Sequence, residues 1–257
     1  MEKVAVVSVN YNMPEVIQYN IDVLKKNSDV PMDFIVVDNG SNEEYMFIPE
    51  SDDIHMVYLD YNLHHTHGYR MGFNYAKSLE ALNWEKYFAY LVCASSGKFI
   101  DDGNDPVMPL YELLKNDDNA VIVQGAHDET SHGFWEHLRN RGTGEPRQTW
   151  MIEYLLTLFR ADWFDEIDWF HPGLHLHGTD LYYSWLARQQ ERGMYVHEGV
   201  EIHREWNNMF EMGRAPESNP GERTTLARKS MVRTLTPELG DNWEQRLFQE
   251  FVKEEMV

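Results

Sequence analysis

Short apolar runs alternate with segments of helical spacing through the first hundred residues. Runs rich in β-branched and aromatic side chains predict strands over residues 4–9, 34–38, 55–59 and 87–94. Apolar positions three and four residues apart predict helices over 15–26 and 73–82, and Pro14 suits the first turn of the earlier one. This alternation predicts an α/β fold built on an open, mostly parallel sheet flanked by helices.

The second half of the chain is less regular. A helix is expected over 107–116, a buried strand over 120–125, and a helix over 180–192 that ends at Gly193. Residues 127–150 are rich in Gly, His, Arg and Trp and predict a loop that can act as a mobile lid, while 150–164 predicts a strand or helix packed on the sheet. A strand pair is expected around Gly199. We expect one domain over 1–206 and a helical C-terminal extension over 207–257.

Charge and composition narrow the class of protein. Acidic residues outnumber basic ones 43 to 22, which gives a formal charge of −21 and disfavours a nucleic-acid partner. The single cysteine, Cys93, excludes a disulfide framework and favours a reducing compartment. No apolar run approaches the ~20 residues of a transmembrane helix, and no signal peptide precedes the first strand. We therefore expect a cytoplasmic protein without a transmembrane segment.

Polar segments follow three of the predicted strands. In an open parallel sheet, ligands bind at the carboxyl ends of the strands. This rule places residues 10–12, 38–41 and 93–105 together at one edge of the sheet. The chemistry of the protein is expected at that edge.

Five segments of the chain carry a resemblance to a known family. VAVVSVNYN, IVVDNGSNEE and YNLHHTHGYRMGFNYA resemble three successive blocks of family 2 glycosyltransferases, and GTDLYYSWLARQQERGMYV and EIHREW resemble two later blocks. Their order and spacing cover roughly residues 3–206 and are most similar to rhamnosyltransferase-like members. The resemblance implies a GT-A fold. It also implies inverting transfer of a sugar from a nucleoside-diphosphate-sugar donor to a hydroxyl acceptor such as a carbohydrate.

The resemblance also implies which residues surround the donor. Tyr11 suits the face of a base, Asp38 can accept a hydrogen bond from a base or ribose, and the guanidinium of Arg70 suits a phosphate. Gly40 allows close backbone approach in the turn, and Gly68 and Gly72 would open space for the ligand. An alternative interpretation of Asp38 is that it only stabilises a turn. The implied donor-binding residues are Asn10, Tyr11, Asn12, Asp38, Asn39, Gly40, Asn62, Gly68, Arg70, Gly72, Asn74, Ser95 and Ser96.

The metal-binding motif of the family is altered. Members carry an Asp-x-Asp motif for a divalent metal such as Mn²⁺ or Mg²⁺, but here the segment is LVCASSGKF, with Ser95 and Ser96 in place of carboxylates. Three interpretations compete: a metal-free enzyme using Arg70 or Lys98 as cations, a metal held by nearby acids, or a domain that has lost catalysis. The candidate metal ligands are Asp101, Asp102 and Asp105, with His203 as the ligand that the resemblance implies.

The general base is also displaced from the family pattern. In LHLHGTDL, Gly178 stands where the family has an acid, so Asp180 is the nearest carboxylate and His177 the second candidate. Asp180 can equally be a helix N-cap. Five histidines between 171 and 203 predict either a metal site or a loop that grips a sugar. Competing functions are a silent nucleotide-sugar- or glycan-binding domain, a histidine-metal-dependent enzyme and a transferase acting on modified nucleic-acid bases.

Overall fold

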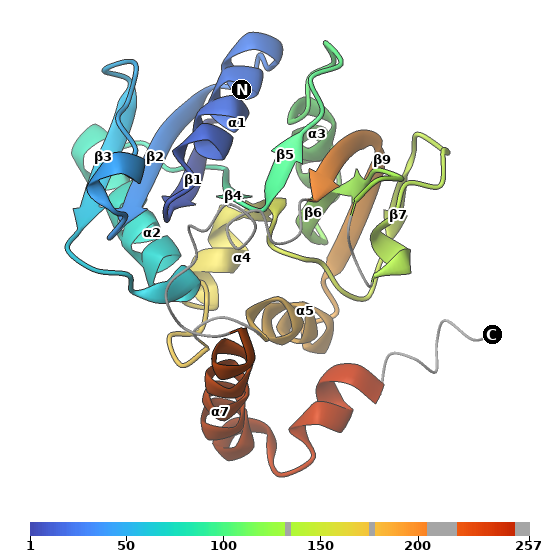
Figure 1. Cartoon of the computed structure of the whole chain (residues 1–257). Helices are drawn as coiled ribbons and strands as arrows, with labels where there is room; N and C mark the ends of the chain where they lie inside the picture. The colour runs from blue at the N-terminus through green and yellow to red at the C-terminus, as the bar shows by residue number, and fades with distance from the viewer. Residues whose placement is uncertain (132–134, 175–177, 205–219, 250–257) are drawn as a thin grey trace.

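The computed structural model describes residues 1–131, 135–174, 178–204 and 220–249. These residues form a nine-stranded sheet in the order β3-β2-β1-β4-β8-β6-β9-β5, with β7 paired to β9 and helices packed on both faces (Figure 1). β1 to β4 run parallel, β8 runs antiparallel to β4 and β6, and β6 and β9 run parallel to each other. The predicted α/β class with a mostly parallel sheet is confirmed.

The strands begin and end close to the predicted apolar runs. They are β1 (Val4–Asn10), β2 (Met32–Asn39), β3 (Ile54–Leu59), β4 (Ala89–Ala94), β5 (Gly97–Phe99), β6 (Ala120–His127), β7 (Pro146–Gln148), β8 (Leu156–Arg160) and β9 (Gly193–Arg204). The helices are α1 (Pro14–Asn27), α2 (His64–Asn83), α3 (Met108–Asn116), α4 (Ala161–Glu166), α5 (Thr179–Gln189) and α7 (Pro220–Leu239). Short helical turns lie at η1 (Glu43–Tyr45), η2 (Glu136–Leu138) and η3 (Gln245–Gln249).

Two apolar layers hold the helices on the sheet. Alternate residues of β1 point to opposite faces, so Val4 and Val6 join the layer under α1 and α3, while Ala5 and Val7 join the layer under α2, α4 and α5. Both layers are fully buried along β1. A continuous apolar strand is therefore the result of helices covering both faces of the sheet.

The start of α2 differs from the prediction. The helix begins at His64, nine residues before the expected Phe73. It includes Gly68 and Gly72, which face the sheet. A Cβ at Gly72 would lie 2.4 Å from Cγ1 of Val7, and one at Gly68 2.9 Å from Cγ1 of Val9. The two glycines therefore allow α2 to pack closely on β1. This corrects the expectation that they open space for a ligand.

We expect Gly72→Ala to lower the free energy of unfolding by roughly 1–3 kcal/mol, since the added methyl group overpacks a filled layer. Urea denaturation measures this value. Leu82→Ala is the control, because Leu82 lies on the same helix but is 74% exposed, so its substitution leaves the packed layer unchanged. A Gly72→Ala variant as stable as the wild type would contradict close packing of α2 on β1.

Two further expectations are corrected in the second half. β9 is one strand rather than a pair around Gly199, with its register to β6 shifted between Gly125 and Ala126. Much of 127–150 is bound to the rest of the fold: β7 pairs with β9, and Arg147 forms an ion pair with the buried Glu198 at 2.6 Å. In the described part of this segment, the expected lid is therefore fastened to β9.

The C-terminal helices pack against α5. Leu235, Leu239 and Trp243 bury their side chains together with Leu181 of α5 and Met151. α7 lies at the opposite end of the molecule from the N-terminus, with α5 between it and the sheet (Figure 1). The expected division at residue 206 falls between 205 and 219, outside the described residues. None of the described helices is long and apolar enough to cross a membrane.

Candidate functional site

The carboxyl ends of β1 and β2 are joined by a buried hydrogen-bond network. Asn10 lies opposite Asp38 in the parallel register and donates from Nδ2 to Oδ2 of Asp38 at 2.7 Å. The same carboxylate accepts hydrogen bonds from the backbone N–H groups of Ser41 at 3.0 Å and Phe47 at 2.8 Å. Asp38 is only 2% exposed. The geometry thus favours the turn interpretation of Asp38, and its contact with a nucleotide stays a prediction.

Asn12 fastens the loop after β1 to the loop after β2. Its Oδ1 accepts from the Asn42 N–H at 2.8 Å, and its own N–H donates to Oγ of Ser41 at 3.0 Å. Asn12 adopts a left-handed φ of 57°, which asparagine tolerates better than most residues. Tyr11 precedes it and is half-buried. Hydrogen bonds therefore join the two loops into one wall of the candidate site, and Tyr11 in this wall is partly exposed.

The end of β2 also positions the start of α2. Asn39 donates to Oδ1 of Asn62 at 3.0 Å and accepts from the Leu63 N–H at 2.9 Å. Gly40 has a φ of 71°, and a Cβ there would lie 2.4 Å from the carbonyl carbon of Tyr61. The close backbone approach predicted at Gly40 is present, but the neighbour is the chain itself.

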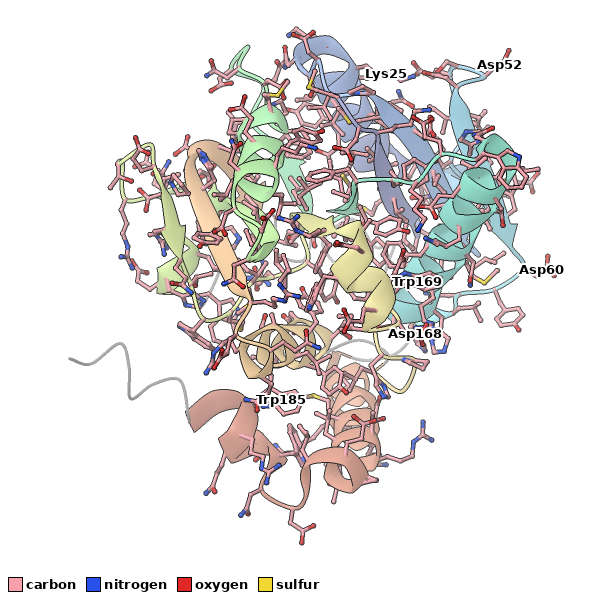
Figure 2. All side chains as sticks on the ribbon, turned by 180° about the vertical axis from the view of Figure 1, so that it is seen from behind. Lys25, Asp52, Asp60, Asp168, Trp169 and Trp185 are labelled. Atoms are coloured by element: carbon pink, nitrogen blue, oxygen red, sulfur yellow. The ribbon has the colours of Figure 1, made fainter. Side chains whose placement is uncertain are left out.

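Arg70 and Asn74 lie further along α2. Arg70 forms an ion pair with Asp168 at 3.0 Å, donates to the Phe170 carbonyl at 2.9 Å and lies over the ring of Trp169. Figure 2 shows Asp168 and Trp169 next to each other between α4 and α2. Arg70 therefore fastens α2 to this loop, and its expected contact with a phosphate stays a prediction. Asn74 is exposed further along α2.

Ser95 and Ser96 form the turn between β4 and β5, where the family motif would lie. Both are half-buried. The turn has two neighbours: the Ala94 N–H donates to the Leu155 carbonyl at 2.6 Å, and Gly97 pairs with Arg204 of β9. The segment before β8 and the end of β9 therefore meet beside the turn.

The acidic residues after β5 lie near the end of α1, at the opposite edge of the sheet from the serine turn. Asp101 pairs with Lys26 at 2.8 Å and accepts from Asn27, and Asp105 accepts from Oγ of Ser28 at 3.0 Å. These partners are at the end of α1, which leads into the amino end of β2. Asp102 accepts instead from Asn104 in its own loop. This position corrects the expectation that Asp101, Asp102 or Asp105 could replace the missing carboxylates, because the chain runs along α1 away from the serine turn.

His203 has protein partners. Its Nδ1 lies 3.0 Å from Oδ2 of Asp128 and 3.2 Å from Oγ1 of Thr130. Among the residues that the structure describes, no group of three His, Cys, Asp or Glu side chains could hold a metal ion. Serine hydroxyls and one histidine–aspartate pair are a poor donor set for Mn²⁺ or Mg²⁺, which prefer several carboxylate oxygens. The described residues at this edge therefore do not fit the metal of the Asp-x-Asp motif.

A buried carboxyl group that the sequence did not indicate lies beside the turn. Glu153 has a side chain only 7% exposed, and its Oε1 lies 3.3 Å from the guanidinium of Arg204. Its Oε2 lies 3.5 Å from Nε2 of His127 and has no hydrogen-bond partner among the described residues. Gln124 accepts from the Glu153 N–H at 3.1 Å. Glu153 is thus fixed in place by the ends of β6 and β9.

Burial shifts the pKa values of both acid and histidine in this cluster. Burial raises the pKa of Glu153 to about 7, with Arg204 opposing the shift and Asp180 adding to it. Burial, with Arg204 and Arg139 nearby, lowers the pKa of His127 to about 3. His127 is therefore neutral at physiological pH, and Glu153 titrates there.

Asp180 lies in the first turn of α5 and is half-buried. The N-cap is Gly178, so the alternative that Asp180 caps the helix is wrong. Ser184 accepts from the Ile152 N–H at 3.2 Å, and this contact brings α5 next to Glu153. Burial raises the pKa of Glu153, and the negative charge of Asp180 is near enough to raise it further. His175 and His177 lie outside the described residues, so the role of His177 is not tested.

One signal in the sequence could have indicated Glu153. It is the only charged residue in the run WMIEYLLTLF, and a charged residue inside a buried apolar run is rare unless it is paired or functional. The apolar composition of the run by itself predicts only packing on the sheet.

The fold of this chain is similar to those of solved structures, although its sequence is not matched by a family model or a curated protein. Among solved structures, GalNAc-T7 with UDP, GalNAc and Mn²⁺ superposes with a TM-score of 0.60 at 12% identity over 100% of this chain. TarS 1-349 of S. aureus in complex with UDP-GlcNAc superposes with a TM-score of 0.60 at 14% identity over 99% of this chain, and a second TarS 1-349 structure with 0.55 at 11% over 98%.

The chain spans about half of the GalNAc-T7 chain, 52%, and 72% and 82% of the two TarS chains. At such low identity the likeness shows the fold alone. The predicted GT-A type of α/β fold is confirmed, and this chain shares it with glycosyltransferases of known structure.

Proposed function

We propose that this protein is an inverting glycosyltransferase that moves a sugar from a nucleoside-diphosphate-sugar donor to a hydroxyl acceptor. The observation that carries the proposal is that α5, which holds Asp180 in its first turn, is hydrogen-bonded through Ser184 to Ile152, in the segment that reaches the β4–β5 turn at Leu155. The shared fold supports the same class of reaction, since its neighbours were solved with UDP or UDP-GlcNAc. A carbohydrate is the acceptor class that the aromatic residues of the second half favour.

Each part of the edge has a role in this proposal. The wall formed by the loops after β1 and β2 receives the nucleotide, with Tyr11 against the base. The turn of Ser95 and Ser96 lies at the diphosphate. Asp180 accepts the proton of the acceptor hydroxyl as its oxygen attacks the anomeric carbon.

A panel of UDP-, GDP-, dTDP- and CMP-sugars tests the donor site. We expect one of them to raise the melting temperature in a concentration-dependent way, because a ligand that binds only the folded state stabilises it. The same compounds are then tested for turnover, measured as nucleotide release with and without acceptor sugars. Failure of every nucleotide sugar to bind would reject the proposed function.

Donor turnover is expected to be the same, within about twofold, in 5 mM EDTA as in 5 mM MnCl₂, since the described donor set does not fit a hard divalent cation. A metal-requiring GT-A glycosyltransferase assayed in the same buffers is the positive control for chelation. Loss of turnover in EDTA that Mn²⁺ restores would contradict metal independence and would point to ligands outside the described residues.

The second candidate function is a catalytically inactive domain that binds a nucleotide sugar. The observation that favours it is the absence of carboxylates from the Ser95–Ser96 turn. Binding without turnover for every donor, with and without Mn²⁺, would support this alternative. It leaves unexplained why a carboxyl group is kept buried at the same edge.

A further inference from the structure

We propose that the C-terminal helix α7 positions the proposed base Asp180, and that Glu238 is the positioning residue through which it acts. This inference rests on the proposed function and deepens it. α7 lies beside α5, the helix that carries Asp180 in its first turn (Figure 1). The resemblance to glycosyltransferases ends near residue 206 and therefore assigns no role to this helix.

α7 packs on the residues immediately before and after Asp180. Leu235 buries its side chain together with Leu181, the residue that follows Asp180. Gly178 begins α5 with a φ of 83°, and a Cβ at this glycine would lie 2.7 Å from Cε of Met231 on α7. The first turn of α5 therefore rests directly on α7.

Glu238 joins the two sides of this turn with its carboxylate. Tyr182, two residues after Asp180, donates from its hydroxyl group to Oε2 of Glu238 at 2.8 Å. His171 precedes α5 in the chain, and its Nε2 lies 2.7 Å from Oε1 of Glu238. Because Nδ1 of His171 accepts from the Gly173 N–H at 3.0 Å, the ring proton is on Nε2 and is donated to Glu238. The carboxylate thus accepts one hydrogen bond from each side of Asp180 in the chain.

Glu238 belongs to a polar stripe along α7. Ser230 and Thr234 both donate to the carbonyl of Gly173, at 2.5 and 3.0 Å. Since Ser230, Thr234 and Glu238 are spaced four residues apart, they lie on one face of the helix. A Cβ at Gly173 would lie 2.4 Å from Oγ1 of Thr234, so the backbone needs glycine to come this close. Directional hydrogen bonds thus fix the residues before α5 more narrowly than apolar packing would.

The other side of the same segment contacts α2. Thr66, in the first turn of α2, donates to the carbonyl of Leu174 and lies 3.3 Å from Oγ1 of Thr179, the residue before Asp180. Asn39 at the end of β2 accepts from the N–H just before α2 at 2.9 Å. Contacts therefore link the proposed nucleotide wall to the start of α5 on one side, and α7 holds it on the other.

Glu238→Ala is expected to lower kcat by roughly 10–100-fold, since a shift of about 1 Å in a reacting group can cost 10²-fold. The substitution removes both hydrogen bonds of the carboxylate and frees the first turn of α5 from α7. The Kd of the nucleotide sugar should stay within about twofold of the wild type, because the effect falls on the base and not on the donor site. Kinetics of nucleotide release and calorimetry measure the two values.

Two further variants show whether geometry is the cause. Glu238→Gln should keep kcat within about threefold of the wild type, because Oε1 can accept from His171 while Nε2 donates to the Tyr182 hydroxyl group. Glu244→Ala is the matched control in the C-terminal extension. It removes an exposed glutamate that pairs with Arg228 of α7 at 3.2 Å, and it should behave as the wild type.

A double-mutant cycle with Asp180→Asn separates positioning from a general loss of stability. If Glu238 acts through Asp180, Glu238→Ala should change kcat by less than about twofold once Asp180 is asparagine. An equal loss in both backgrounds would overturn the inference, as would a wild-type kcat in Glu238→Ala. Loss of donor binding in Glu238→Ala would show a structural role and also overturn it. Failure of the wild type to bind any nucleotide sugar would instead reject the proposed function itself.

Discussion

Asp180→Asn is expected to lower kcat by roughly 10²–10⁴-fold, the usual contribution of a positioned general base. Asparagine has nearly the same shape, so Oδ1 can still accept from the Leu181 N–H, as the carboxylate does at 3.0 Å. It cannot take a proton from the acceptor. Nucleotide binding should remain within about twofold of the wild type, because Asp180 contacts the acceptor and not the donor in the proposed arrangement. Steady-state kinetics and calorimetry measure the two effects.

Asp162→Asn is the matched control. Asp162 lies in the first turn of α4, is exposed, and accepts from the N–H of the next residue, Trp163, as Asp180 does from Leu181. Both substitutions remove a negative charge near a helix N-terminus, which typically changes stability by about 0.3–1 kcal/mol. A kcat lowered equally in both variants would indicate an effect on stability. Retained kcat in Asp180→Asn would reject Asp180 as the base.

The sheet could be predicted from sequence because its strands carry a local signal. In β1 and β4 every residue is buried, so covering both faces requires continuous apolar runs. The turn chemistry around Gly40 was equally local, since a positive φ favours glycine wherever the chain doubles back. Features set by neighbouring residues in the chain were therefore predicted close to their observed positions.

Features set by distant residues were not predictable in this way. Arg70 is a good phosphate ligand by residue type, but its partner Asp168 is about a hundred positions away. Asp101 follows the serine turn in sequence, yet β5 carries it along α1 to the other edge of the sheet. The start of α2 was missed because Gly68 and Gly72 indicate a loop in sequence and close packing in space. Each of these positions depends on contacts with residues that are far away in the sequence.

Glu153 shows why the chemistry was harder to predict than the fold. Its properties depend on burial and on Gln124, His127 and Arg204, which come from β6 and β9. No spacing motif links these positions. A raised pKa at a buried carboxyl group is destabilising at neutral pH, and such groups cluster at functional sites. Stability measurements can therefore test the site without knowledge of the substrate.

Glu153→Gln is expected to stabilise the protein at pH 8 by about 3 kcal/mol, and to change stability little at pH 4. Glu153 has a folded pKa of about 7, above its ordinary value of 4.5. The folded state therefore binds more protons than the unfolded state between these values, and stability falls as pH rises through this window. Glutamine mimics the protonated acid and removes the penalty. Urea denaturation at pH 4, 6 and 8 measures the difference.

Glu198→Gln gives the opposite sign and is the control for this measurement. Burial alone would raise the pKa of Glu198, but hydrogen bonds from the Thr143 N–H and from Arg147 lower it to about 2. The ionised Glu198 therefore contributes stability above pH 4.5 that is lost as pH falls towards 2, and Glu198→Gln should destabilise the protein at pH 8. Equal destabilisation by both substitutions at pH 8 would mean that Glu153 is an ordinary ion-pair partner of Arg204. A gain confined to Glu153→Gln would show that the fold keeps this carboxyl group at a cost to stability, as expected for a residue retained for chemistry.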